Sequence, residues 1–382
     1  MNKIYKNFLL PTGLLSGTII GAGVFALPYV FKAAGLALGL FYLILGGLVY
    51  SFIHLLYADI IVRTPGEHRF VGYVERYLGA GFKWLAVLMS VLEMIFVMAI
   101  YLVLSVSFAN LVLSGFSIYK VLTFWILGSL AIFLSLKKLA FIEFLIAWGM
   151  IFIIALIFVL GLGHWPRLAS QLWLPNFSYA LFPLAPILFA LGGRVAIPSV
   201  VKYFHLPGVG HKHSLIKRTV IVGTLIPAIV YGLFVFGILG LTDNVTEDAV
   251  TGLVGAVSPA LLAVMGILGL LALWSSYIVV GLDVNQVLLY DLKIARLLRL
   301  ALVVAAPLAL YFLSSQDFLG LISFVGGIFL GLEGIFIGAV WLRAKKLAPR
   351  EPALISKNIF LMIGVAFLVF AAALVRELTK IF

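Results

Sequence analysis

Two glycine-rich segments inside long apolar stretches are the first places where this chain could do chemistry. They are SGTIIGAGVFALP, from Ser16 to Pro28, and FALGGRVAIPSV, from Phe189 to Val200. Glycine costs a helix about 1 kcal/mol relative to alanine, so clustered glycines predict that the helix unwinds. An unwound turn exposes N–H groups that suit a carboxylate and carbonyls that suit a cation. The alternative is that the small residues let two helices pack closely.

Arg194, Glu93 and Glu333 are charged residues that lie deep inside apolar stretches. Arg194 follows the glycine pair of the second segment, Glu93 lies within the third stretch, and Glu333 lies midway along the tenth. An unpaired charge at membrane depth is costly, so all three are functional candidates, the two glutamates for coupling or gating. We predict that Arg194 meets Glu93 in at least one state, with Glu333 as the competing partner or as a structural link. Asp59, near the end of its stretch, is predicted to be a solvated end group.

Long membrane helices must position these residues. The chain has 382 residues, of which 64% are hydrophobic and 10% charged, whereas a soluble domain has about 25% charged residues. Apolar stretches of about 20 residues cross a bilayer as helices, and the short alternating segments of a β-barrel do not occur. The sequence has no cysteine, which excludes a disulfide framework and a thiolate metal site. The eleven predicted spans are 8–33, 35–62, 83–112, 119–136, 141–163, 178–201, 214–241, 252–282, 297–313, 318–342 and 356–376.

Lysine and arginine are shared unevenly between the predicted loops. With the N-terminus in the cytoplasm, twenty of the 26 fall on the cytoplasmic side, five fall outside, and Arg194 lies within a span. This split follows the positive-inside rule and supports the count of eleven, because a missed span would scramble the alternation. We predict a multi-pass protein of the cell (plasma or inner) membrane with its N-terminus cytoplasmic and its C-terminus outside. The formal charge of +12 reflects this loop bias, and no nucleic-acid partner is expected.

An internal repeat relates the two glycine-rich segments. The six residues from Gly23 to Pro28 and the six from Gly193 to Pro198 both fit the pattern G-x-x-A-[L/I]-P. The second copy lies five spans after the first, so the copies run in opposite directions through the membrane. Corresponding glycine and proline interruptions in two halves indicate an inverted-repeat transporter with a site near the midplane. We predict one domain over 1–382, with repeats at about 8–163 and 178–342 and an extra helix at about 356–376.

The same segments carry a family resemblance. GTIIGAGVFALP resembles the first-helix motif of the amino acid–polyamine–organocation superfamily, nearest to its aromatic amino acid permease and amino acid/auxin permease branches. FALGGRVAIPSV resembles the sixth-helix motif, and SSYIVVGLDVNQVLLYDLKI, from Ser275, resembles the end of the eighth helix. The resemblance implies an all-α LeuT-type fold of two inverted five-helix repeats with helices 1 and 6 broken, plus an eleventh helix. Arg194 departs from the family pattern, where that position often has no positive charge.

The resemblance also implies a function and a substrate site. It implies a permease that moves amino acids by alternating access. The backbone N–H groups of Gly21, Ala22 and Gly23 would hold the substrate carboxylate. The other residues expected at the substrate site are Tyr101, Phe189, Gly192, Gly193 and Arg194.

An ion site is implied beside the substrate. Carbonyls near Gly17 and Ile20 would face a cation, and the hydroxyls of Ser275 and Ser276 would complete the site. Such serines otherwise bond to backbone carbonyls or to a neighbouring helix. An all-oxygen site suits a hard cation, so sodium is slightly favoured over protons as the coupling ion of a symporter. The two buried glutamates are the opposing case, because either could take a proton.

Two other membrane functions compete with transport. A receptor of the same fold would bind an amino acid and signal without moving it. A channel would need a continuous pore, whereas two broken helices favour an occluded site. The sequence has no phosphate-binding loop, nucleophile elbow or H-E-x-x-H motif, so we expect no enzyme, no cofactor and no metal other than sodium. The expected partners are an amino acid and the lipid bilayer.

Overall fold

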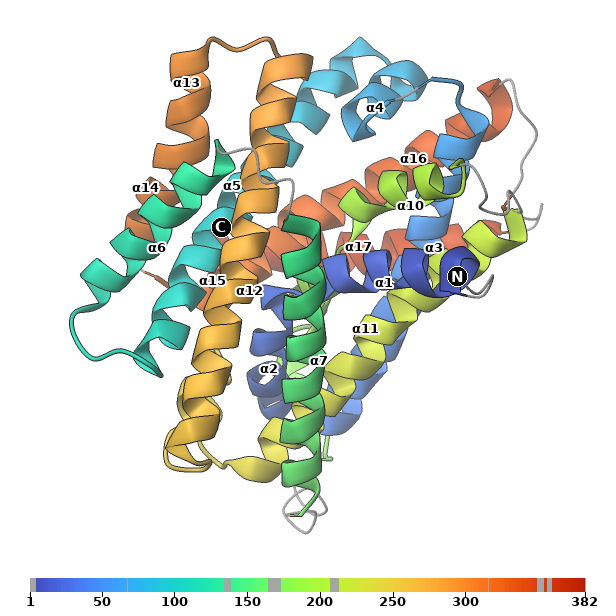
Figure 1. Cartoon of the computed structure of the whole chain (residues 1–382). Helices are drawn as coiled ribbons and strands as arrows, with labels where there is room; N and C mark the ends of the chain where they lie inside the picture. Colours follow the sequence, from blue (N-terminus) through green and yellow to red (C-terminus); the bar gives the residue numbers. More distant parts are fainter. Residues whose placement is uncertain are drawn as a thin grey trace.

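The computed structural model of the chain is almost entirely helical (Figure 1). It describes residues 5–66, 68–133, 139–163, 173–206, 213–314, 316–348, 354–355 and 359–381, with side chains of the 139–162 helix described from residue 149. In these residues eight helices are long and apolar enough to cross a membrane, and one bent pair makes a ninth. Two shorter apolar helices, Ser117–Ile132 and Gly149–Leu162, lie where the fourth and fifth spans are predicted.

The first half of the chain runs from the first broken span to α7. The first span consists of a π turn (Tyr5–Leu9), α1 (Leu10–Ile19), a 3-10 turn (Ala22–Ala26) and α2 (Leu27–Ala34). The helices that follow are α3 (Leu36–Arg63), α4 (Phe70–Leu78), α5 (Ala80–Asn110), α6 (Ser117–Ile132) and α7 (Leu139–Leu162). The short helix α4 lies in the link between the second and third predicted spans.

The second half begins with a short turn (Phe177–Tyr179) and the other broken span. That span consists of α9 (Leu184–Leu191), a 3-10 turn (Arg194–Ala196) and α10 (Ile197–Tyr203). Single helices α11 (His213–Leu241) and α12 (Pro259–Gln286) follow, the second extended by a π turn (Val287–Asp291). The last spans are α13 (Arg296–Leu300), a π turn (Ala301–Ala305) and α14 (Ala306–Leu313); α15 (Phe318–Phe324), a π turn (Val325–Phe329) and α16 (Leu330–Leu347); and α17 (Phe360–Ile381).

The eighth span begins later than its predicted start at residue 252. The Ser258 backbone is extended, and its hydroxyl accepts a hydrogen bond from the Leu261 amide, which caps α12. The preceding loop satisfies its polar groups internally, since Asp248 accepts bonds from the Thr251 amide and hydroxyl. The start of this helix is therefore set by the hydrogen bond that caps it. Hydropathy alone does not reveal such a cap.

The repeated motif produces the same local structure twice. After α1 the chain becomes extended at Gly21, with φ −142° and ψ −154°, makes a 3-10 turn, and starts α2 with Pro28 in its first turn. After α9 the chain breaks at Gly193, makes a 3-10 turn, and starts α10 with Pro198 in its first turn. Proline fits a first turn because its missing N–H would have no helical partner there. Figure 1 shows α1 turning into α2, a bend of 53° between the two parts of that span.

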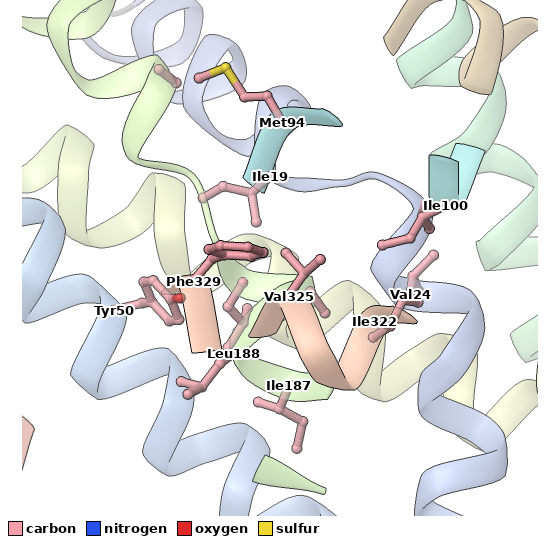
Figure 2. Packing of buried hydrophobic residues seen from close by; sticks show 14 of the residues in the cluster. Ile19, Val24, Tyr50, Met94, Ile100, Ile187, Leu188, Ile322, Val325 and Phe329 are labelled. Atoms are coloured by element: carbon pink, nitrogen blue, oxygen red, sulfur yellow. The ribbon is translucent and has the colours of Figure 1, made fainter. Parts of the chain in front are cut away.

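An apolar core surrounds both breaks. Ile19 at the end of α1, Leu188 of α9, and Val325 and Phe329 of the π turn before α16 lie close together (Figure 2). Other large apolar side chains point outward, with Leu361 on α17 82% exposed. Exposed apolar surface of this kind fits contact with lipid.

Asp59 is not the solvated end group that the sequence predicts, and that prediction is wrong. Its side chain is fully buried, with Oδ2 accepting from Arg63 Nε at 2.5 Å and from Trp341 Nε1 at 2.8 Å. Its Oδ1 accepts from the Leu354 amide at 3.2 Å. The carboxylate therefore joins the end of α3 to α16 and to the link that follows α16.

Candidate functional site

The two breaks lie against each other through small residues. A Cβ atom added at Gly23 would lie 2.5 Å from the Cα of Ala190 on α9. One added at Gly193 would lie 3.0 Å from Ile19 Cδ1 and 3.3 Å from His54 Cε1. Both glycines are therefore needed for close packing, the alternative that the sequence left open.

Gly192 and Phe189, both expected at the substrate site, lie where the sixth span meets the tenth. A Cβ atom at Gly192 would lie 3.1 Å from Leu330 Cδ1, and the Phe189 Cβ lies beside Gly326 in the π turn that precedes α16. Both residues are partly buried. A π turn is an uncommon interruption that occurs often at functional sites.

Gly21 differs from the packed glycines. A Cβ atom there would meet nothing closer than the Ile19 carbonyl oxygen, at 3.9 Å. Its backbone is extended, a conformation that other residues also adopt. Gly17 likewise has no heavy atom within 4 Å of an added Cβ. The first break thus has room beside Gly21, while Ala22 and Gly23 are buried.

Arg194, Glu93 and Glu333 form what we call the charged cluster. The Arg194 Nε donates a hydrogen bond to Glu333 Oε2, and its Nη2 lies 3.9 Å from Glu93 Oε2. The exposed fractions of the three side chains are 8%, 13% and 5% respectively. The guanidinium also stacks on Phe70 of α4, with Cζ 4.5 Å from the ring centroid. Both predicted partners thus contact Arg194, and Glu333, ranked second from the sequence, is the hydrogen-bonded one.

The groups around the cluster are mostly neutral. The hydroxyls of Tyr50 and Tyr57 on α3 lie near it. His54 is buried beside it, with Nδ1 2.9 Å from the Thr224 hydroxyl. On the α12 side the nearby charge is Asp283, which pairs with Arg69 at 3.4 Å in a half-exposed position.

Tyr101 and Ser276 are brought together between α5 and α12, where the tyrosine hydroxyl faces the serine side chain. Ser275, beside it, is buried. The half-helix α1, which carries Gly17 and ends just before Ile20, packs mainly on α11 and is bonded to it through Ser16. The ion role of these residues stays a prediction.

Sequence reasoning missed Phe70, because the link between the second and third spans was read as a loop. The segment from Phe70 to Leu78 is an amphipathic helix whose buried residues are Phe70, Val71, Tyr73, Val74 and Tyr77. Their three- and four-residue spacing is the signal that could have predicted α4.

Comparisons with known proteins identify the family and the fold. The model of the tryptophan/tyrosine permease family matches residues 5–375. No curated protein matches the sequence.

Among solved structures, MhsT in complex with L-phenylalanine has a TM-score of 0.68 at 15% identity, covering 98% of both chains. A manganese transporter of Eremococcus coleocola scores 0.72 at 13% identity, covering 99% of this chain and 87% of that one. Mhp1, a nucleobase–cation symporter with bromovinylhydantoin bound, scores 0.62 at 14% identity, covering 98% and 91%. The predicted fold of inverted repeats with two broken helices is confirmed.

Proposed function

The chain belongs to the tryptophan/tyrosine permease family, and on that premise we propose that it carries an aromatic amino acid together with a proton across the cell membrane. It is a secondary transporter of amino acids that works by alternating access, and not an enzyme. The observation that carries the proposal is the charged cluster, in which one buried arginine faces the buried carboxyl group of Glu333 and the partly buried carboxyl group of Glu93.

The first break is the proposed site of the substrate carboxylate. The N–H groups of Ala22 and Gly23 begin the outer half of the span, where the helix dipole favours an anion. The room beside Gly21 admits a small ligand group. These features support a carboxylate held by backbone, as the sequence predicts.

The aromatic side chain is proposed to lie between the third and sixth spans. Tyr101 and Phe189 supply rings there, and the segment from Gly192 to Arg194 would close the site from the sixth span. The family name and the phenylalanine bound to MhsT both support an aromatic substrate.

The charge of the cluster supports a proton as the coupling ion. One guanidinium and two carboxylates sum to one negative charge, and an unbalanced charge at membrane depth is costly. Glu93 and Glu333 both face the one guanidinium of Arg194. A proton on one of the two carboxyl groups would make the cluster neutral. We propose that Glu93, the more exposed of the two and the one farther from Arg194, takes and releases it.

Sodium is the second candidate, at the site predicted from Gly17, Ile20, Ser275 and Ser276. The sequence slightly favours sodium, whereas the charge count of the cluster favours a proton. The two ions make different demands on the chain, because only the proton requires an ionisable side chain.

Reconstitution into liposomes tests the ion. Radiolabelled L-tryptophan uptake is measured with an inward proton gradient in sodium-free medium, and with a sodium gradient at equal pH. Uptake driven by the proton gradient alone is expected. Glu93→Gln should abolish gradient-driven uptake but keep substrate exchange, since the substitution holds the neutral form permanently.

Glu75→Gln is the matched control, because Glu75 pairs with Lys83 on the surface. This variant should behave as wild type. Uptake that needs sodium and ignores pH would reject the proton and favour the serine site. Absence of uptake of any aromatic amino acid would reject the substrate class.

The location and orientation are also proposed. We place the protein in the plasma or inner membrane with its N-terminus cytoplasmic. Single cysteines at Asn244 and Lys346, both exposed, are introduced into the cysteine-free chain. In intact cells an impermeant maleimide should label the first and not the second. The reverse result would overturn the orientation.

A further inference from the structure

The hydroxyl of Tyr231 lies where both broken spans stop. Tyr231 is on α11 and is fully buried. Its oxygen is 2.7 Å from the carbonyl oxygen of Ile19, the last residue of α1, and 2.9 Å from that of Ala190, one residue before the end of α9. One side chain from the seventh span thus touches the first and the sixth spans at their breaks.

Both contacts are made to helix C-termini. The last carbonyls of a helix have no partner within it and carry the negative end of the helix dipole. Two such negative ends converge here, so a hydrogen-bond donor between them is stabilising. The Tyr231 phenol has one O–H proton, which the two carbonyl oxygens share.

The Gly21 backbone, just past the first break, lies near the Tyr231 hydroxyl. The hydroxyl itself donates to the carbonyls of Ile19 and Ala190. The phenol thus ties the end of α1 to α9 beside the first break.

Other contacts at this side of the breaks are neutral too. The Ser16 hydroxyl donates to the Gly223 carbonyl at 2.9 Å. The Thr224 hydroxyl donates to the Val220 carbonyl at 2.8 Å, so it must accept from His54 Nδ1. Among the described residues no charged group contacts the two carbonyl ends. The donor to both carbonyl oxygens is the neutral hydroxyl of Tyr231.

We propose that Tyr231 is the positioning residue of the substrate site, and that its hydroxyl is a built-in donor which fixes the first break to the sixth. The part that concerns substrate binding rests on the proposed function. The part that concerns the breaks stands on the geometry alone. Because one group is bonded to both breaks, its loss should loosen both together.

Tyr231→Phe removes the hydroxyl and keeps the ring. Tyr277→Phe is the matched control: Tyr277 is also fully buried, but it lies on α12 and its hydroxyl faces Ser129, away from both breaks. Hydrogen exchange of the purified proteins is followed by mass spectrometry over residues 16–26 and 187–196. Tyr231→Phe should speed exchange in both segments, and Tyr277→Phe should speed it in neither.

Transport kinetics give the second readout. Tyr231→Phe should raise KM for L-tryptophan about tenfold, the effect of about 1.4 kcal/mol, with a smaller change in kcat. Unchanged exchange, or faster exchange at one break only, would overturn the proposal. If the wild type transports no aromatic amino acid, the proposed function fails while the exchange data still decide the role of Tyr231.

A measurement on the wild type guards against a variant that does not fold. Because one hydroxyl is bonded to both breaks, residues 16–26 and 187–196 of the wild type should open together, and their amides should exchange with the same opening free energy. Residue-resolved exchange measures these free energies directly. Clearly different opening free energies at the two breaks would overturn the proposal without any substitution.

Discussion

The broken helices are held by two different kinds of contact. The hydrogen bonds of Ser16, His54 and Tyr231, which we call the neutral seam, join α1, α3, α9 and α11. The charged cluster joins the sixth span to the third and tenth through Arg194. A hydrogen bond between neutral groups has the same strength at any pH near 7. The net charge of the cluster, by contrast, changes whenever one of its carboxyl groups binds or releases a proton. The seam is suited to hold the breaks together, and the cluster is suited to respond to a gradient.

The largest effect is expected from stranding a charge in the cluster. Arg194→Gln leaves Glu333 buried without its partner, which typically costs about 3–5 kcal/mol. Thermal unfolding in detergent should show a much lower Tm. Adding Glu333→Gln should recover part of the loss, because the stranded charge is then removed.

Lys83→Gln is the control for that prediction, since the Lys83–Glu75 pair is at the surface and such pairs contribute about 0–1 kcal/mol. A double variant as unstable as the sum of the two singles would mean that Arg194 and Glu333 act independently.

Substitutions at two glycines of the first break should distinguish a role in helix packing from a role in substrate binding. Gly23→Ala would push a methyl group into Ala190, and overpacking of this kind costs about 1–3 kcal/mol. Gly21→Ala has room, so its Tm should equal that of wild type while L-tryptophan binding weakens. Thermal shift and radioligand binding measure the two effects. Equal losses of stability would show that both glycines only pack.

The pH dependence of substrate binding should arise from the charged cluster and not from the neutral seam. If one proton binds with the substrate, affinity for L-tryptophan falls by up to about tenfold for each unit that the pH rises. This slope should vanish in Glu93→Gln, because no proton is then exchanged there. It should persist in Tyr231→Phe, although affinity is lower at every pH. Loss of the slope in Tyr231→Phe would join the two regions into one functional unit.

The smallest effect is expected in the loop between α11 and α12, outside both regions. Partial burial, with help from Asp317 and Asp248, raises the pKa of Glu247 above its usual value. A raised acid pKa means that the folded state binds more protons than the unfolded state, so this group lowers stability as pH rises from its unfolded pKa through the folded one. Glu247→Gln should raise Tm slightly at pH 7 and leave it unchanged at pH 4. A lower Tm at pH 7 would show that the charge is favourable.

The class of protein, the two breaks and the transporter function were all predicted from residue types and short motifs. Lipid leaves unpaired backbone no partner, so apolar stretches of this length must be helices. Glycine and proline act on their own turn of the chain, which is why Gly23 to Pro28 and Gly193 to Pro198 predict two equivalent breaks. The resemblance in those same segments led to the permease family, which the family match confirms.

Which polar groups are hydrogen-bonded to each other depends on the tertiary structure. Arg194 and Glu333 are 139 residues apart, Tyr231 and Ile19 are 212 apart, and Asp59 and Trp341 are 282 apart. Hydropathy places each of these residues at a depth but gives no rotation of its helix, and rotation determines which neighbour a side chain reaches. That is why Glu93 ranked above Glu333, why Asp59 was expected in water, and why the role of Tyr231 had no signal in the sequence. Each pairing is set by how the helices pack, because a buried polar group is stable only where the fold brings it a partner.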